Sequence, residues 1–206
     1  MSRHAPRKDV TATNPRRIEA PASGAAHVSA TLVAISGSLR RHSINSAVLR
    51  TAAVAAALDG IRVEIADSVR DLPPFDPDLE SKPPELALRF RKVCEDAAGV
   101  LLAVPEYTFG IPGSFKNAMD WTVGSGSLYR KPVTVLKISQ PGRGGHVRET
   151  LELALRAHGA DIVHRSVPVS RRDLDPRGEV SDPRIITELR AVVVELRTRA
   201  GALQAA

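Results

Sequence analysis

The sequence predicts an α/β protein built on one parallel β-sheet of five strands, with helices on both faces. Short apolar runs alternate with stretches of helical spacing from about residue 30 to the end of the chain. Strands that run in the same direction need a helical connection, so this alternation favours a parallel sheet. At 206 residues with 43% hydrophobic residues, the chain is long enough for one domain with a sizeable core.

The first two strands differ in pattern. The run TLVAIS at 31–36 is almost wholly apolar, which is typical of a strand buried on both faces. The run IRVEIA at 61–66 alternates apolar and charged residues, which is typical of an edge strand with one wet face. Between them we expect a helix that begins at Ile44 and stops at residues 59–60. Its apolar stripe comprises Ile44, Val48, Thr51, Ala52, Ala55 and Leu58.

The alternation continues after a proline-rich loop at 67–84. The next helix is expected at 85–97, with apolar positions at Leu86, Phe90, Val93, Cys94 and Ala97. The remaining expected elements are a buried strand at 99–105, a helix near Pro112, a central strand at 131–139, a helix at 144–160, a polar strand at 161–170 and a closing helix at about 184–203.

The two strands with polar positions, 61–66 and 161–170, are expected at the edges of the sheet. That placement predicts the strand order 2-1-3-4-5 of flavodoxin-like folds, which reverses between strands one and three. Ligands of such sheets bind outside the carboxyl ends of the strands at this switch point. A site is therefore expected in the loops after the first, third and fourth strands.

The loop after the first strand reads SGSLRRHSIN at 36–45 and carries groups suited to a phosphate. Ser43 is placed to cap the helix, whose N-terminus offers unpaired N–H groups. The Ser, Arg and Asn side chains add donors, and Gly37 is expected to let the backbone approach the anion. The alternative is a plain polar turn whose serine only caps the helix. The glycine patterns of a dinucleotide site or a P-loop are absent, so the phosphate would belong to a mononucleotide.

The loop after the third strand, PEYTFGIPGSFKNAMDW at 105–121, is suited to a flat ring. Pro105 ends the strand, and Glu106 and Tyr107 follow where a ring would lie. Aromatic residues make up only 3% of the chain, yet two of them stand in the first part of this loop. The alternative is a proline-rich connection whose aromatic residues, Trp121 above all, belong to the core.

Taken together, the two loops resemble the NADPH-dependent FMN reductase family, a group with the flavodoxin-like fold that includes flavin, quinone, azo-dye and chromate reductases. GSLRRHSIN at 37–45 is similar to the family pattern G-S-L-R-x-x-S-x-N. PEYTFGIPGSFKNAMDW is similar to the pattern P-E-Y-N-x-x-x-P-G-x-L-K-N-A-x-D-W. The resemblance covers residues 30 to about 200, and the order and separation of the motifs agree.

The resemblance implies a role for each matching residue. The FMN phosphate is expected on Ser38, Arg40, Ser43 and Asn45. The isoalloxazine ring is expected beside Pro105, Glu106, Tyr107 and Thr108, where the family usually has Asn in place of Thr108. The loop SQPGRGGHV at 139–147 is similar to the family's turn after the fourth strand, which implies contacts to the polar edge of the ring from Ser139, Gly142 and Gly145.

The expected function is that of an NAD(P)H-dependent FMN oxidoreductase. Bound FMN would take a hydride from NADPH or NADH and pass electrons to a flavin, quinone, azo compound or metal oxyanion. No catalytic side chain is assigned, and Glu106 is expected to be structural. The alternatives are a non-enzymatic flavodoxin-type electron carrier, a redox-sensing FMN-binding protein, or a binding module for another anion. Carriers are usually acidic with a T-x-T-G-x-T loop, whereas this chain has a formal net charge of +6.

The composition of the chain indicates which classes of partner to expect and where in the cell the protein is expected. Residues 1–28 hold five Lys and Arg residues against two acidic ones, so half of the net charge lies in an expected disordered basic tail before a domain at 29–206. Few aromatics accompany the remaining charge, so nucleic acid is not expected, and no apolar run is long enough to span a membrane. Cys94, the single cysteine, is expected to be a buried thiol in a reducing, cytoplasmic setting, and no metal site is expected.

Subunit association is a further expectation from the resemblance, because flavin sites of the family often lie beside a dimer interface. A homodimer or homotetramer is therefore expected. The loop at 71–80 is a candidate to reach a neighbouring subunit's flavin, and a plain surface loop is an equally open interpretation.

Overall fold

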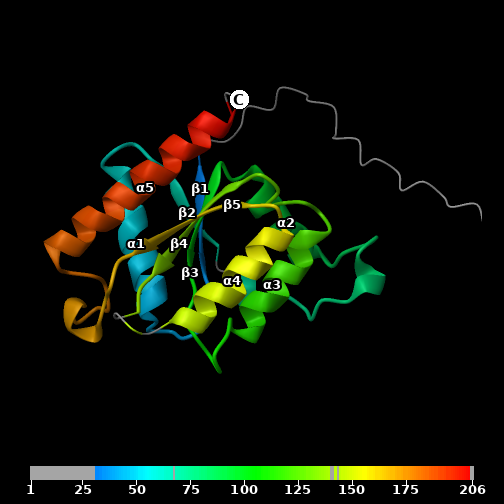
Figure 1. Cartoon of the computed structure of the whole chain (residues 1–206), viewed down its shortest axis with the longest axis horizontal. Helices are drawn as coiled ribbons and strands as arrows, with labels where there is room; N and C mark the ends of the chain where they lie inside the picture. The colour runs from blue at the N-terminus through cyan, green and yellow to red at the C-terminus, as the bar shows by residue number, and fades with distance from the viewer. Residues whose placement is uncertain (1–30, 67, 140–141, 143, 205–206) are drawn as a thin grey trace, which may run out of the picture.

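The computed structural model describes residues 31–66, 68–139, 142 and 144–204; the predicted tail lies outside them. Five strands, all paired in parallel, form one sheet in the order β2-β1-β3-β4-β5 (Figure 1). The predicted fold class and strand order are confirmed, with β2 and β5 at the two edges. The strands are β1 (Leu32–Ser36), β2 (Val63–Ala66), β3 (Gly99–Ala103), β4 (Pro132–Lys137) and β5 (Asp161–Ser166).

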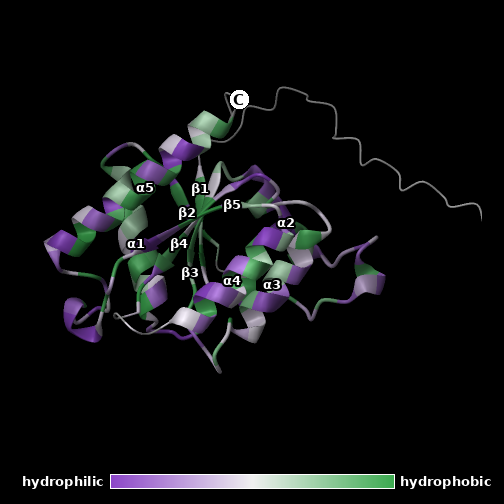
Figure 2. Cartoon of the chain, in the orientation of Figure 1, coloured by the Kyte–Doolittle hydropathy of each residue, from purple (hydrophilic) through white to green (hydrophobic). Residues whose placement is uncertain are grey.

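Helices cover both faces of the sheet, α1 and α5 on one and α2, α3 and α4 on the other (Figure 1). The strands between them are mostly hydrophobic, whereas the helices carry both kinds of residue (Figure 2). None of the described helices is both long and apolar enough to cross a bilayer. The helices are α1 (Ile44–Ala57), α2 (Glu85–Asp96), α3 (Gly113–Val123), α4 (Gly145–Ala157) and α5 (Pro183–Gln204), with short 3₁₀ turns η1 (Ser68–Arg70), η2 (Pro77–Leu79) and η3 (Arg171–Asp173).

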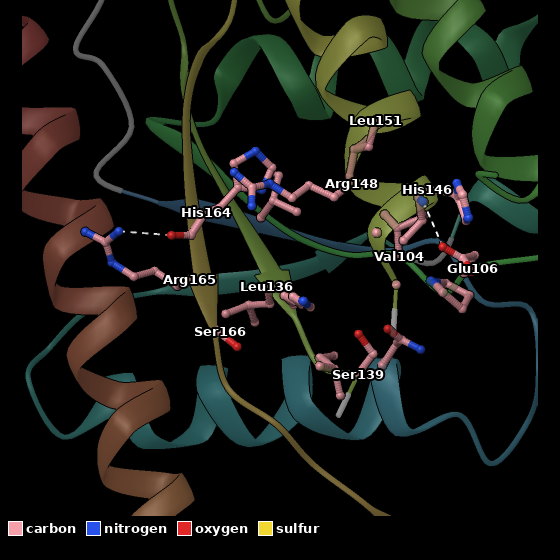
Figure 3. A pocket seen from close by; sticks show the side chains of 18 of the residues that line it. Val104, Glu106, Leu136, Ser139, His146, Arg148, Leu151, His164, Arg165 and Ser166 are labelled. Carbon is pink, nitrogen blue, oxygen red and sulfur yellow. Dashed lines mark hydrogen bonds between the residues drawn. The ribbon is translucent and has the colours of Figure 1, made fainter. Parts of the chain in front are cut away.

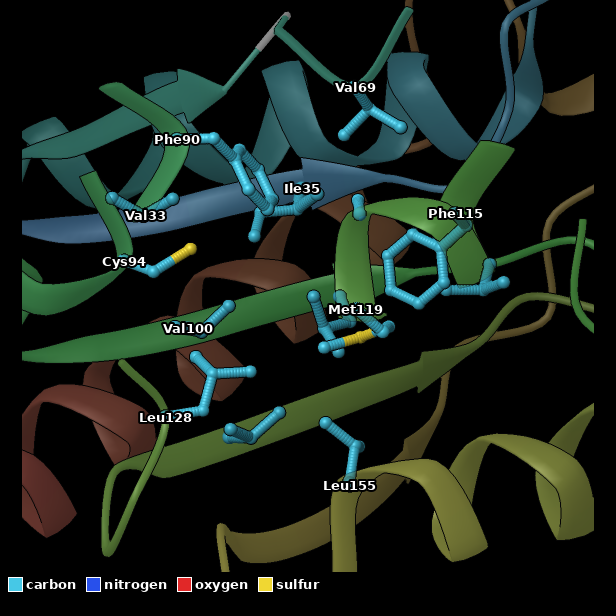
Figure 4. Packing of buried hydrophobic residues seen from close by; sticks show 14 of the residues in the cluster. Val33, Ile35, Val69, Phe90, Cys94, Val100, Phe115, Met119, Leu128 and Leu155 are labelled. Atoms are coloured by element: carbon cyan, nitrogen blue, oxygen red, sulfur yellow. The ribbon is translucent and has the colours of Figure 1, made fainter. Parts of the chain in front are cut away.

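The central strands are buried on both faces, as their apolar runs predict. Successive side chains of a strand point to opposite faces, so Val33 and Ile35 enter the core beneath α2, α3 and α4. Leu32 and Ala34 enter the core beneath α1 and α5. Figure 4 shows the first of these cores, where Val33, Ile35 and Val100 meet side chains from the covering helices. Packing on both faces holds the carboxyl ends of these strands in a fixed array, from which the site loops emerge.

The predicted edge strand shows the expected alternation. Val63 and Ile65 pack against the core, while Glu64 is exposed. Three other strands end earlier than predicted, among them β4, which stops at Lys137 rather than at 139. β3 stops at Ala103 rather than at 105, because Pro105 has no N–H to donate to a ladder. β5 stops at 166 rather than at 170, although the N–H groups of Val167 and Val169 still donate to the carbonyl oxygens of Lys137 and Ile138.

Two residues assigned to apolar helix stripes are exposed instead. Leu58 is 76% exposed, because α1 ends one residue earlier and Leu58 is only its C-cap. Leu86 is 38% exposed in the first turn of α2, where Ala87 takes the buried position. Cys94 is buried as predicted, and this burial raises the pKa of its thiol to about 12.

The proline-rich loop at 67–84 is tied to α3. The carbonyl oxygen of Pro73 accepts hydrogen bonds from Nδ2 of Asn117 (2.9 Å) and Nε1 of Trp121 (2.8 Å). The backbone N–H of Phe75 donates to Oδ1 of Asn117 (2.7 Å), and its ring meets Trp121 edge-on. Trp121 is fully buried, so its predicted core position is confirmed. Two residues of the second motif therefore anchor this loop.

Candidate functional site

A cavity of about 930 Å³ lies at the carboxyl ends of β3, β4 and β5, beside the first turns of α1 and α4 (Figure 3). Its size is within the range of ligand pockets. It borders the switch point between β1 and β3, where the strand order predicts a site. Five of the ten predicted site residues line it: Asn45, Pro105, Glu106, Ser139 and Gly142. The other five, Ser38, Arg40, Ser43, Tyr107 and Thr108, stand in the same loops outside its lining.

The first loop leads into α1 through a serine cap. Oγ of Ser43 accepts a hydrogen bond from the backbone N–H of Ser46 (3.4 Å), which confirms the predicted helix start. Ser38 and Ser43 are almost buried, and their hydroxyl hydrogens keep the ability to donate. Arg40 is exposed and forms no side-chain bond within the described part of the chain. The loop therefore carries hydroxyl and guanidinium donors and leads into the free N–H groups of the first helical turn. Of its predicted site residues, Asn45 lines the cavity.

Gly37 is also required by a contact that was not predicted from the sequence. A Cβ at this position would lie 2.8 Å from Cγ1 of Val104, at the end of the neighbouring strand. Its backbone N–H donates to the carbonyl oxygen of Ala103 (2.9 Å). The close approach that requires glycine here is between the first and second loops, and it holds them together.

The second loop makes a tight hairpin at its tip. Tyr107 and Gly110 exchange two backbone hydrogen bonds of 3.0 Å. Thr108 and Phe109, between them, have φ angles of +50° and +58°, as in a type I′ turn. Such a conformation suits Asn or Gly and strains a β-branched residue. Phe109 projects from this turn into the lining of the cavity, although it was not among the predicted site residues.

Glu106 joins the second loop to the third. Its Oε2 accepts a hydrogen bond from the backbone N–H of Val147 (2.9 Å) in the first turn of α4 (Figure 3). α4 has no capping side chain of its own, because its N-cap is Gly144. A carboxylate at this end of a helix is also favoured by the helix dipole. Glu106 therefore caps α4 from another loop, which is a structural contact.

The third loop runs from Ser139 to the start of α4, with residues 140, 141 and 143 outside the described part. Gly144 has φ of +75°, and a Cβ there would lie 2.4 Å from Oγ of Ser139. Gly142, Gly144 and Gly145 all line the cavity. Gly144 thus brings the backbone against the serine, and the three glycines contribute only backbone to the part of the lining that they form.

Several residues that line the cavity were not predicted from the sequence. Lys137 ends β4, His146 and Arg148 belong to the first turn of α4, and His164 lies in β5. His146 meets the ring of Phe109 edge-on, with 5.1 Å between centroids. The polar strand around His164 was correctly placed at an edge, but no local pattern indicates that its histidine faces a cavity shared with α4.

Comparison with known proteins agrees with this geometry. The family model for NADPH-dependent FMN reductase matches residues 30–173. A probable NADPH:quinone oxidoreductase 2 of Oryza sativa is 29% identical over 185 residues, covering 84% of this chain and 90% of that protein. An NAD(P)H-dependent FMN reductase of Pseudomonas aeruginosa is 32% identical over 161 residues, covering 73% of this chain and 84% of that protein.

Among solved structures, the flavoenzyme NAD(P)H:(acceptor) oxidoreductase FerB of Paracoccus denitrificans is similar to this chain, with a TM-score of 0.67 and 27% identity. The match covers 84% of this chain and 97% of FerB. The family model spans well over half of the chain, and both of its motifs border the cavity. The chain belongs to the NADPH-dependent FMN reductase family.

Proposed function

We propose that the cavity at the ends of β3, β4 and β5 holds FMN and that the chain uses NADPH or NADH to reduce a quinone-type acceptor. The observation that carries this proposal is the convergence of three loops, from the ends of β1, β3 and β4, on one cavity. Relatives named as quinone oxidoreductases and FMN reductases support the acceptor class. When bound, FMN supplies the redox chemistry, taking a hydride from the nicotinamide and passing electrons to the acceptor.

The phosphate of FMN would be held at the start of α1. Ser38, Ser43 and Asn45 would donate hydrogen bonds, and Arg40 would contribute a charge-assisted pair. The almost buried hydroxyls and the unpaired guanidinium support this assignment, because a phosphate would satisfy donors that the described residues leave without an acceptor. The N–H groups of the first helical turn add to the attraction for an anion.

The ring of FMN would lie between the second and third loops. Pro105 and Glu106 on one side and Ser139 and Gly142 on the other line the cavity and support this position. Tyr107 and Thr108 would contribute to the ring site through their backbone, because they form the hairpin that positions Phe109 beside the cavity. Glu106 would hold the two loops at a constant distance through its bond to α4. The chain's own contribution is therefore binding and orientation, with no side chain assigned to proton transfer.

The test is a titration of the full chain with FMN, followed by anaerobic addition of NADPH or NADH. We expect a yellow complex that bleaches directly with a reduced nicotinamide and is reoxidised by a quinone. A chain that binds no FMN would overturn the proposal. A complex reduced only through a separate reductase would instead indicate an electron carrier.

A homodimer or homotetramer and a cytoplasmic location belong to the same proposal. The exposed Tyr107 and Phe109 beside the cavity support association, because aromatic side chains are enriched at interfaces. The loop at 71–80, which is tied to α3, presents a fixed surface for such a contact. Sedimentation over a range of concentrations measures the oligomeric state, and a monomer at all concentrations would contradict it.

A further inference from the structure

The cavity extends past β4 to the outer strand β5, beyond the residues assigned to FMN. Three basic side chains line this part, which we call the β5 end: Lys137 from β4, Arg148 from α4 and His164 from β5. Figure 3 shows the Arg148 side chain reaching from α4 toward His164. Val135 of β4 pairs in register with His164, so the imidazole stands beside the strand that also carries Lys137.

The two cations at the β5 end are unpaired. Neither Lys137 nor Arg148 forms an ion pair or a side-chain hydrogen bond within the described residues. Arg148 stands four residues before Glu152, a spacing at which opposite charges on a helix attract. Glu152 instead accepts a hydrogen bond from Arg156 (2.6 Å), one turn further along. The Arg148 guanidinium thus remains available to a ligand.

The neighbouring charges are compensated within the protein. Arg165, which also lines the cavity, binds Glu195 of α5 through its Nε (2.8 Å). Glu106, an acidic side chain in the lining, bonds to the N–H of Val147. The first turn of α4 adds the partial positive charge of a helix N-terminus at the position of Arg148. The β5 end therefore carries an excess of positive charge directed at the cavity.

His164 adds an imidazole nitrogen that has no hydrogen bond within the described residues. Its Nε2 is buried and has no hydrogen bond within the described residues, although Oε2 of Glu152 lies 3.6 Å away. Buried polar atoms of this kind are rare, because losing water without a replacement bond is costly. Burial, and then the charge of Arg148, lower the pKa of His164, while Glu152 acts in the opposite direction. An anion beside Arg148 and Lys137 would offset this effect.

We propose that Lys137, Arg148 and His164 form an anion subsite for the ligand that reacts with FMN. The group bound is a phosphate or carboxylate, and it has two sources: the 2′-phosphate that distinguishes NADPH from NADH, or an acid group on the acceptor. The identity of this ligand rests on the proposed function. The subsite itself rests on the two unpaired cations and on the imidazole nitrogen that no hydrogen bond satisfies within the described residues.

Kinetics with matched ligands distinguish the two sources. The variants are Arg148→Gln and Lys137→Gln, with Arg184→Gln as control, because Arg184 is almost fully exposed on α5. The ligand pairs are NADPH against NADH, and a carboxylated naphthoquinone against its neutral parent. Each variant loses one charge-assisted bond to the anion, which should raise KM roughly tenfold to a hundredfold for NADPH or for the carboxylated quinone. The KM of the matching ligand without that charge and the affinity for FMN should stay unchanged.

The affected pair identifies the source of the anion. An effect confined to NADPH assigns the subsite to the 2′-phosphate, and one confined to the carboxylated quinone assigns it to the acceptor. Equal changes for charged and neutral ligands, or no change for either pair, would overturn the proposal. Thermal melts of each variant show whether the fold is intact, and Lys137→Gln gives an independent reading if Arg148→Gln is destabilised.

A binding measurement tests the subsite without turnover. The ring signals of His164 are followed by NMR during titration of the FMN-loaded chain with inorganic phosphate, and with adenosine 2′-phosphate against adenosine. We expect the phosphates to shift these signals in the wild type, and at least tenfold weaker binding in Arg148→Gln. No shift, or an equal shift in both proteins, would overturn the proposal. A chain that binds FMN but is not reduced by nicotinamides would refute the proposed function, while this titration would still report on the subsite.

Discussion

Gly144, the N-cap of α4, has a backbone conformation that only glycine adopts readily. Its φ is +75°, and a Cβ would lie 2.4 Å from Oγ and 3.3 Å from Cβ of Ser139. We expect Gly144→Ala to destabilise the fold for two separate reasons. The left-handed backbone costs about 1–2 kcal/mol for a residue with a Cβ. Displacing the serine side chain adds about 1–3 kcal/mol, the usual range for overpacking.

Gly142 offers a matched control, because it shares the backbone geometry without the clash. Its φ is +80°, but among the described residues a Cβ at this position would meet nothing within 4 Å. Gly142→Ala should therefore cost only the backbone contribution. Ser139→Gly combined with Gly144→Ala should show a favourable coupling of about 1–3 kcal/mol relative to the two single changes.

Urea unfolding measures each free energy, and thermal melts should follow at about 2–4 °C per kcal/mol for a chain of this size. The reasoning would be refuted if Gly144→Ala were no more destabilising than Gly142→Ala. It would equally be refuted if the coupling with Ser139→Gly were absent.

Further expectations concern four other positions. Glu106→Ala should lower the free energy of unfolding by about 1.5–3 kcal/mol, and Glu106→Gln by less because it keeps an acceptor for Val147; equal losses in urea unfolding would contradict this. Thr108→Asn should stabilise the hairpin by about 1 kcal/mol, because asparagine tolerates the positive φ, and a lower melting temperature would count against it. Burial, and then the charge of Arg148, hold the pKa of His164 below its ordinary 6.5. The unfolded chain therefore protonates this histidine at a higher pH than the folded chain does, and the free energy of unfolding should fall as the pH drops through 6.5. His164→Asn should make the melting temperature depend less on pH in melts at pH 5 to 8. Cys94, with a thiol pKa of about 12, should not react with a disulfide reagent at pH 8 until the chain unfolds, and rapid labelling of the folded protein would show that the thiol is accessible.

Much of the fold could be predicted because its signals are local. The apolar run before Ser36 and the alternating run around Glu64 differ in burial because one strand is covered on both faces and the other lies at an edge. Strand order followed from that difference, and the position of the cavity followed from the strand order. Ser43 and Trp121 were also placed correctly, since a helix cap and a large buried aromatic depend on their nearest neighbours in the chain.

Other features depend on pairs of residues far apart in the sequence. The need for Gly37 comes from Val104 across the sheet, and the need for a carboxylate at 106 comes from the uncapped start of α4. Phe109 lines the cavity because Thr108 and Phe109, at the tip of the hairpin, both have positive φ angles. None of these contacts leaves a periodic pattern in the chain.

The sequence thus determined the layers of this protein, the order of its strands and the three loops that border its cavity, because periodicity, capping and turn residues act over a few neighbouring positions. Only the tertiary structure decided which contacts hold those loops together. It alone also brought Arg148 and His164 to the β5 end of the cavity. The burial and the charge of a site like this depend on which surfaces pack together. Packing brings together residues that are far apart in the sequence, and no local sequence pattern indicates such a contact.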